Sequence, residues 1–158
     1  MICPYSSIDN LRKSLRQKKT VFVSGCFDII HPGHIEFLEK AATLGDTLIV
    51  GVLSDSYIRA KKKRQAVHTQ QQRAKIIQAL KPVTHVILTP YLKGPYPSLD
   101  VLRSLRPNVF FRQEKNHAYL PLKAELKSLG ISLKALSMPK VHSTSKTIRK
   151  VQKMPTLL

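Results

Sequence analysis

Residues 20–34 read Thr-Val-Phe-Val-Ser-Gly-Cys-Phe-Asp-Ile-Ile-His-Pro-Gly-His. The segment opens with Thr20–Val23, a β-branched and apolar run that predicts a buried strand. Gly25–Pro32 then predicts a turn, and the apolar stripe of His34–Leu44 predicts a helix. Thr47–Leu53 is a second apolar run. Strand, helix and strand in this order predict a βαβ unit with parallel strands and a right-handed crossover.

The same alternation continues along the rest of the chain. We expect further helices at Ile8–Gln17, Thr69–Leu80 (opened by a capping box of Thr69 and Gln72), Ser98–Leu105, Ala118–Leu129 and Ser143–Lys153, and strands at His85–Thr89, Val109–Arg112 and Ile131–Leu136. Five strands alternating with helices predict a Rossmann-like α/β fold with a doubly wound, five-stranded parallel sheet. We expect a helical extension over residues 1–19, a single domain over 20–153 and a tail over 154–158.

The composition excludes several classes of protein. The chain has 158 residues, 42% of them hydrophobic, which is enough to bury a core and is unlike a disordered chain. No apolar run approaches the roughly 20 residues that span a bilayer, and no secretory signal pattern is present at the N-terminus. Two cysteines, Cys3 and Cys26, do not make a disulfide framework. We therefore expect a cytoplasmic protein that does not associate with a membrane.

The loop after the first strand has the residues of a phosphate-binding site. Gly25 allows a sharp turn, Pro32 suits the first position of a helix, and Gly33 leaves room for a ligand near the backbone. His31 and His34 are three residues apart at the helix start, so both imidazoles can face one point. The helix N-terminus adds N–H donors and a dipole that favours an anion. This loop is therefore predicted to bind phosphate and to stabilise the charge of a phosphoryl-transfer transition state.

The formal net charge of +18 is the unusual feature of the composition, and it is unevenly distributed. Residues 21–55 contain one base and five acids, whereas residues 56–82 contain eight bases and no acid. Such a basic chain suggests anionic partners, with nucleic acid as the first to consider. Part of the excess charge can serve a phosphate site, but the five bases before residue 20 exceed what one small anionic substrate needs.

The pattern Gly-x-Phe-Asp-x-x-His-x-Gly-His resembles the signature of the cytidylyltransferase-like nucleotidylyltransferases. The likeness covers about Leu11 to Gln152 and is strongest up to Asp55. It is greatest to the adenylyltransferase domain of heptose-phosphate enzymes, followed by glycerol-3-phosphate cytidylyltransferases. The resemblance implies transfer of a nucleoside monophosphate from a triphosphate to a phosphorylated sugar or alcohol such as heptose 1-phosphate, with release of pyrophosphate and without a protein nucleophile. An enzyme that adenylylates FMN is a further alternative.

The resemblance also implies roles for individual residues. His31 and His34 would contact the triphosphate together with a lysine after the second strand, for which Lys62 is favoured over Lys61 and Lys63. The implied nucleotide-binding residues are Gly25, Cys26, Phe27, Asp28, Gly33, Lys61, Arg73, Arg112, Ser143, Thr144 and Ser145. Magnesium would accompany the phosphates, and the family likeness implies a homodimer.

Two segments differ from the patterns of the nearest families. Met138–His142 stands where cytidylyltransferases have Arg-Thr-Glu-Gly-Ile, so their arginine is missing. Arg112–Lys115 stands where the heptose enzymes have Lys-Gly-Gly-Asp, and only the first basic residue is kept. The missing arginine and the likeness to the heptose enzymes favour ATP over CTP.

Other interpretations of the same residues remain. Cys26, His31 and His34 have a spacing that permits zinc, although a fourth ligand is not apparent. The basic run Lys61–Arg64 is also typical of a solvated loop. Arg73 is also typical of the exposed face of a surface helix. The whole chain has two alternatives, a basic protein that binds nucleic acid or nucleotides and has lost the chemistry, and a relative of class I aminoacyl-tRNA synthetases. The second is disfavoured by the short chain, and the intact histidine pair makes nucleic acid the less favoured partner.

Overall fold

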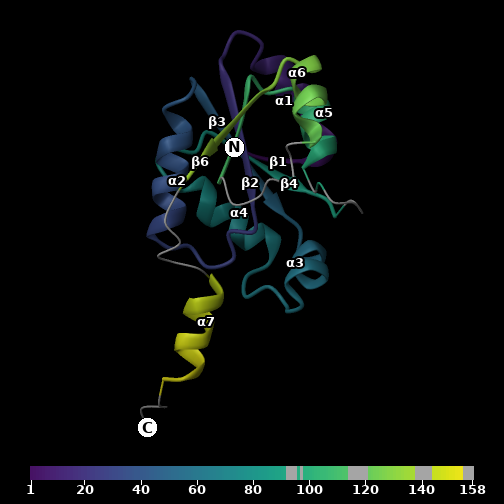
Figure 1. The fold of residues 1–158 in the computed structure, drawn as a ribbon. Coiled ribbons are helices and arrows are strands. Elements are labelled where there is room, and N and C mark those ends of the chain that lie inside the picture. The colour runs from purple at the N-terminus through teal and green to yellow at the C-terminus, as the bar shows by residue number, and fades with distance from the viewer. Residues whose placement is uncertain (92–95, 97, 114–120, 138–143, 155–158) are drawn as a thin grey trace.

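The computed structural model describes residues 1–91, 96, 98–113, 121–137 and 144–154. Within these residues, six parallel strands form one sheet in the order β1-β4-β3-β2-β5-β6, with helices packed against it (Figure 1). The strands are β1 (Ile2–Pro4), β2 (Thr20–Gly25), β3 (Thr47–Leu53), β4 (His85–Thr89), β5 (Val109–Gln113) and β6 (Ser132–Leu136). The predicted Rossmann-like α/β fold is confirmed.

Two layers of helices cover the sheet, because side chains alternate between its faces along each strand. In β2, Val21 and Val23 belong to one core cluster and Phe22 to the other. Helices α2 (Pro32–Ala42) and α4 (Gln70–Gln78) pack on the first cluster. The second cluster lies under α1 (Ile8–Ser14), α5 (Leu99–Leu105) and α6 (Lys123–Ser128). The remaining helices are the 3-10 turn η1 (Tyr5–Ser7), α3 (Asp55–Lys62) and α7 (Thr144–Gln152).

The prediction of five strands was wrong, because β1 adds a sixth. Ile2–Pro4 pairs in parallel with Val86–Leu88 at the edge of the sheet. A run of three residues that ends in proline is too short to show the alternation that identifies a strand. The edge position accommodates Pro4, since a strand there can lack one N–H donor. Residues 1–19 therefore contribute a strand to the sheet in addition to the predicted helix.

Most predicted helix starts are confirmed, and one helix was not predicted. Pro32 begins α2, and Thr69 and Gln72 form the capping box that opens α4. Helix α3 instead occupies a segment in which only Ile58 is buried, so its apolar pattern is too weak to identify it. Ser54 caps it by accepting a hydrogen bond from the N–H of Tyr57 at 3.2 Å.

The sheet order places a ligand site at the end of β2. From β2 the chain proceeds to β3 and β4 on one side, and β5 lies against β2 on the other side. Ligands in open α/β sheets bind beyond the carboxyl ends of the strands where the order reverses in this way. The loop between β2 and α2 lies at that end, and α7 extends away from the body beyond it (Figure 1). None of the helices in the described part of the chain is both long and apolar enough to cross a membrane.

Candidate active site

The two histidines of the loop after β2 lie directly against each other. His31 caps α2 in an extended conformation, and the N–H of His34 donates to its carbonyl at 2.8 Å. The two imidazole rings are stacked, with centroids 3.8 Å apart and planes 16° apart. The edge of the Phe27 ring contacts His34 at a centroid distance of 5.3 Å. The predicted meeting of both imidazoles at the start of one helix is therefore what the structure shows.

The environment of His34 keeps its imidazole neutral. Burial, and to a smaller extent the charge on His31, lower the pKa of His34 from 6.5 to about 4. Its Nδ1 atom is buried without a hydrogen-bond partner among the residues that the structure describes. A buried polar atom without a partner is costly unless a ligand or water completes it. The imidazole is therefore suited to form a hydrogen bond with a bound anion.

Gly25 has a steric role that differs from the predicted one. The left-handed backbone conformation that turns the chain falls at Phe27, with φ 48°, and not at Gly25. A Cβ atom on Gly25 would lie 2.9 Å from the Phe27 ring, which is too close for real side chains. Gly25 thus leaves space for the ring that packs on His34. At Gly33 a Cβ atom would lie 3.4 Å from Nδ1 of His31.

Asp28 connects the loop after β2 to the segment between α3 and α4. Its carboxylate is buried and accepts hydrogen bonds from Arg64 at 2.5 Å, from the N–H of Val67 at 2.9 Å and from the N–H of His68 at 3.2 Å. Burial alone would raise the pKa of Asp28, but these hydrogen bonds outweigh it and the pKa is lowered. Both oxygens are occupied, so Asp28 shapes the site by holding residues 64–68 in place.

Arg73 lies inside the protein and not at its surface. Its guanidinium donates to the carbonyls of Cys26, Leu53 and His68, and it pairs with Asp55 at 2.6 Å. The side chain is fully buried, so in this conformation it joins the ends of β2, β3 and the loop before α4. These contacts give Arg73 a positioning role, and its contact with a nucleotide remains a prediction.

The lysines after β3 lie at the end of α3. Lys61, Lys62 and Lys63 are all exposed. Burial raises the pKa of the Cys26 thiol, and the charge of Lys62 is the largest of the effects that oppose this rise. The charge of Lys62 thus acts on the loop after β2, and its contact with the phosphates remains a prediction.

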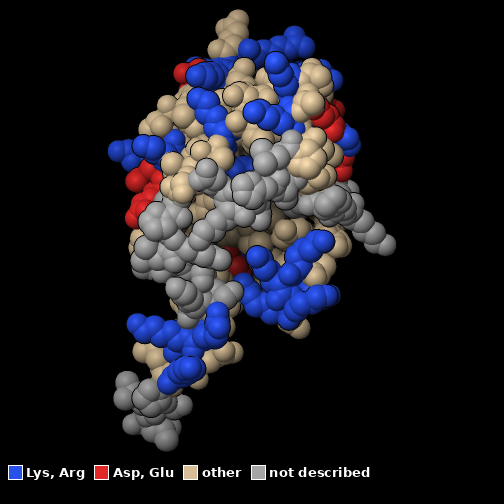
Figure 2. All heavy atoms as spheres, viewed as in Figure 1, with Lys and Arg blue, Asp and Glu red and all other residues tan. Residues whose placement is uncertain are grey.

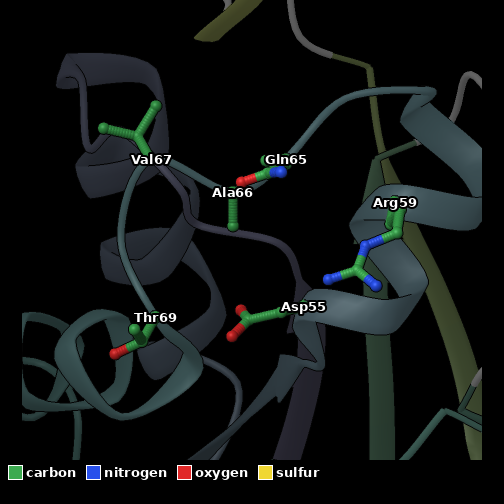
Figure 3. A pocket seen from close by; sticks show the side chains of 6 residues that line it. All are labelled: Asp55, Arg59, Gln65, Ala66, Val67 and Thr69. Carbon is green, nitrogen blue, oxygen red and sulfur yellow. The ribbon is translucent and has the colours of Figure 1, made fainter.

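A cavity of about 190 Å³ lies beside the segment that Asp28 holds (Figure 3). Asp55 and Arg59 face it from α3, and Gln65, Val67 and Thr69 line it from the segment before α4. The sequence analysis did not identify this cavity. The guanidinium of Arg59 therefore lies beside the segment before α4, in which the N–H groups of Val67 and His68 bind Asp28.

Of two further predicted residues, Thr144 contacts the loop after β2, and Arg112 packs on a residue of its own strand. Arg112, near the end of β5, is half-buried with its guanidinium 5.6 Å from the centroid of the Phe110 ring. The Thr144 hydroxyl at the start of α7 donates to the carbonyl of Ile29 at 3.4 Å. Ser143, the segments 114–115 and 138–142, and the side chain of Ser145 lie outside the described residues.

Sequence reasoning missed two residues that hold the site together. Arg64 was counted with the solvated basic run, although it binds Asp28. The Gln70 amide donates to the carbonyls of Val52 and Thr89 at 2.7 and 2.8 Å, and it joins the ends of β3 and β4. The sequence signal available for Gln70 was its position as the first residue of a helix, directly after the N-cap residue Thr69. In the described part of the chain, which includes Cys26, His31 and His34, no three His, Cys, Asp or Glu residues form a group that could hold a metal ion.

Known proteins are similar to this chain in sequence and in fold. A family model described as cytidylyltransferase-like matches residues 22–150. A FAD synthase from Pyrococcus horikoshii is 33% identical over 141 residues, which cover 85% of this chain and 93% of that protein. The bifunctional protein HldE from Wolinella succinogenes is 32% identical over 153 residues, which cover 92% of this chain and 30% of that protein.

The solved structures agree with this assignment. The lipopolysaccharide core biosynthesis protein from Thermoplasma volcanium aligns with a TM-score of 0.62 at 25% identity, over 77% of this chain and 99% of that one. A pantoate-beta-alanine ligase from Francisella tularensis, at 21% identity and a TM-score of 0.65, shares the fold. Residues 22–150, which the family model matches, contain most of β2, the histidine pair and the start of α7. The chain therefore belongs to the cytidylyltransferase-like family and is a nucleotidyltransferase.

Proposed function

We propose that the chain transfers the AMP group of ATP to a phosphorylated acceptor and releases pyrophosphate. The observation that supports this most directly is the stacked pair of His31 and His34 at the start of α2 and at the reversal point of the sheet. In this reaction a phosphate oxygen of the acceptor attacks the α-phosphorus, and the bond to the pyrophosphate oxygen breaks. Catalysis then depends on positioning and charge stabilisation, because no side chain forms a covalent bond with the substrate.

The chain supplies donors where negative charge develops. The dipole of α2 adds a positive potential beside the two imidazoles, because His31 is the N-cap residue of this helix and His34 lies in its first turn. The stacking of His31 on His34 and the contact with Phe27 fix the ring of His34 before substrate arrives. A donor that is already oriented needs no reorganisation in the transition state, and this is the main source of its effect. Lys62 would add a mobile positive charge from the end of α3.

Magnesium fits this site as part of the substrate. The carboxylates of Asp28 and Asp55 are already bound, Asp28 by Arg64 and Asp55 by Arg73. A protein cage of carboxylates for the ion is therefore not available from these two residues. Mg²⁺ commonly keeps its waters and binds through substrate phosphates, so it would enter as the complex with the triphosphate.

Two acceptors are supported by different observations. FMN is supported by the FAD synthase relative, because that protein is matched over 93% of its own length. Heptose 1-phosphate is supported by the likeness of the leading helix and the segment that starts at Val23 to the heptose enzymes. We take FMN first, since the HldE match covers only 30% of that protein. A homodimer remains a prediction from the family likeness, and a cytoplasmic location remains a prediction from the composition.

The test is a matrix of ATP, GTP, CTP and UTP against FMN, heptose 1-phosphate, glycerol 3-phosphate and phosphocholine, with pyrophosphate release as the measurement. We expect turnover with ATP and FMN, and FAD as the product by chromatography. Turnover with CTP and glycerol 3-phosphate would overturn the preference for ATP. If a folded sample releases no pyrophosphate with any pair, the proposal of an active transferase fails.

A further inference from the structure

A second cavity lies at the end of the sheet opposite to the histidine pair. It has a volume of about 190 Å³, and the polar residues that line it are Arg12, Arg16, Lys18, Thr20, Arg106 and Asn108. Thr20 is the first residue of β2 and Asn108 directly precedes β5, so the cavity lies at the amino ends of these strands. The candidate active site lies at the carboxyl end of β2. The two sites are therefore separated by the length of the sheet.

We infer that this cavity is a second anion site, which binds a small ligand with two or more phosphate groups. Four of its six polar lining residues are cationic, and none of the lining residues is acidic. None of these four cations forms an ion pair with a carboxylate among the described residues. Lys and Arg also gather on the molecular surface at the end where α1 lies, at the top of the view (Figure 2). Four like charges around one cavity repel each other unless an anion lies between them.

Helix dipoles do not account for this cluster. A base in the last turn of a helix interacts favourably with the helix carbonyls, and this applies to Arg12 at the end of α1. Arg16 and Lys18 lie beyond that end, where the effect of the dipole has faded. The carboxylate of Asp46 accepts from the backbone N–H of Lys19, but Asp46 does not line the cavity.

The backbone at Arg106 supports a functional role for its side chain. Arg106 ends α5 in the left-handed conformation, with φ 48°. Glycine is the usual residue at such a position because any side chain is strained there. An arginine at this position adds a cation to the cavity at a cost in conformational energy.

The neutral residues of the cavity are also ordered. The side-chain carbonyl of Asn108 accepts from the N–H and the hydroxyl of Thr20, at 2.8 and 3.1 Å. The Thr20 hydroxyl in turn accepts from the N–H of Asn108 at 3.2 Å. These bonds fix the amide of Asn108, whose nitrogen has no acceptor among the described residues and remains a donor. Three arginines with planar guanidinium groups, a lysine and an amide N–H suit phosphate oxygens, and the small volume favours a compact ligand.

The test is calorimetric titration of the full chain with inorganic pyrophosphate at about physiological ionic strength, together with amide NMR shifts. We expect two binding events, one of which shifts the signals of Thr20 and Asn108. Lys18→Gln should weaken that event about tenfold, because a charge-assisted hydrogen bond is lost. Lys19→Gln removes the same charge from the adjacent residue, which does not line the cavity, and should change affinity less than about twofold.

Arg106→Gly separates binding from folding. Glycine relieves the strained backbone, so this variant should melt at or above the temperature of the wild type and still lose the second event. His34→Ala should leave the second event intact, which distinguishes it from binding at the active site. The absence of any binding event that shifts the signals of Thr20 and Asn108, or equal effects of Lys18→Gln and Lys19→Gln, would overturn the inference. A different result would also overturn it: Lys18→Gln binds a short single-stranded RNA more weakly than the wild type but binds pyrophosphate equally well. The cations would then belong to a nucleic-acid surface.

Discussion

The carboxylate of Asp28 lies 2.5 Å from the guanidinium of Arg64, and this pair joins the loop after β2 to the segment between α3 and α4. The carboxylate is fully buried and Arg64 is a quarter exposed. The same carboxylate accepts two backbone N–H groups, so it also fixes the course of residues 67 and 68. The geometry of the loop that contains the histidine pair therefore depends on a residue that does not itself need to contact the substrate.

We expect Asp28→Asn to destabilise the protein by about 2 kcal/mol, because Arg64 loses its charged partner in a buried position. Denaturation with urea at neutral pH measures this loss. Asp100→Asn, which breaks an exposed pair with Arg103, is the control and should cost less than about 0.5 kcal/mol.

The lowered pKa of Asp28 also predicts a sign for the pH dependence of stability. Its stabilisation is present above the unfolded pKa and is lost as the pH falls through the folded pKa, and the variant should lack this component.

His34→Ala should lower the turnover number by about 10²–10³, because it removes one preorganised donor at the transition state. Pyrophosphate release measures this, and circular dichroism establishes that the variant is folded. His85→Gln changes a histidine at the opposite end of the sheet, at the start of β4, and should retain turnover per folded molecule. Equal turnover in wild type and His34→Ala would contradict the mechanism.

The pH dependence of stability should reveal the neutral state of His34. An unfolded chain binds a proton at this histidine near pH 6.5, whereas the folded chain does so only near pH 4. Between these values the unfolded state binds more protons, so the free energy of unfolding falls as the pH is lowered. His34→Gln should flatten this slope, as measured by urea denaturation between about pH 5 and 6.5. Identical slopes for the two proteins would mean that His34 is not held neutral by the fold.

Lys62 and Lys61 are adjacent, and their variants should differ. Lys62→Gln should reduce kcat/KM by about 10–100-fold, and Lys61→Gln by less than about threefold, if Lys62 contributes charge at the phosphates. The reactivity of Cys26 provides an independent measurement, because Lys62 opposes the burial that raises the pKa of this thiol. Its pKa should rise further in Lys62→Gln, as measured by the pH dependence of alkylation. A rise of equal size in Lys61→Gln would contradict the assignment.

The sequence predicted the elements with strong periodicity, and it failed where tertiary contacts determine the role. Thr47–Leu53 coincides with β3 because a buried central strand is apolar throughout. Arg73 was expected at a phosphate because its charge is visible in the sequence, whereas the four acceptors that it binds come from other parts of the chain. Its spacing of four from the buried Ile77 was a signal that it faces inward. The partnership of Asp28 with Arg64 spans 36 residues and leaves no local pattern.

The edge position of β1 has a consequence for how the chain acquires its structure. Met1 donates to the carbonyl of Thr84, which lies 83 residues later in the sequence. During synthesis the first strand therefore has no partner until β4 has been made, and closing so long a loop is slow. The apolar side of the nascent βαβ unit can meanwhile assemble around β2 and β3, which are the central strands. We expect β1 to join the sheet only after β2 and β3 have paired, and its amides to exchange with solvent faster than those of these two central strands.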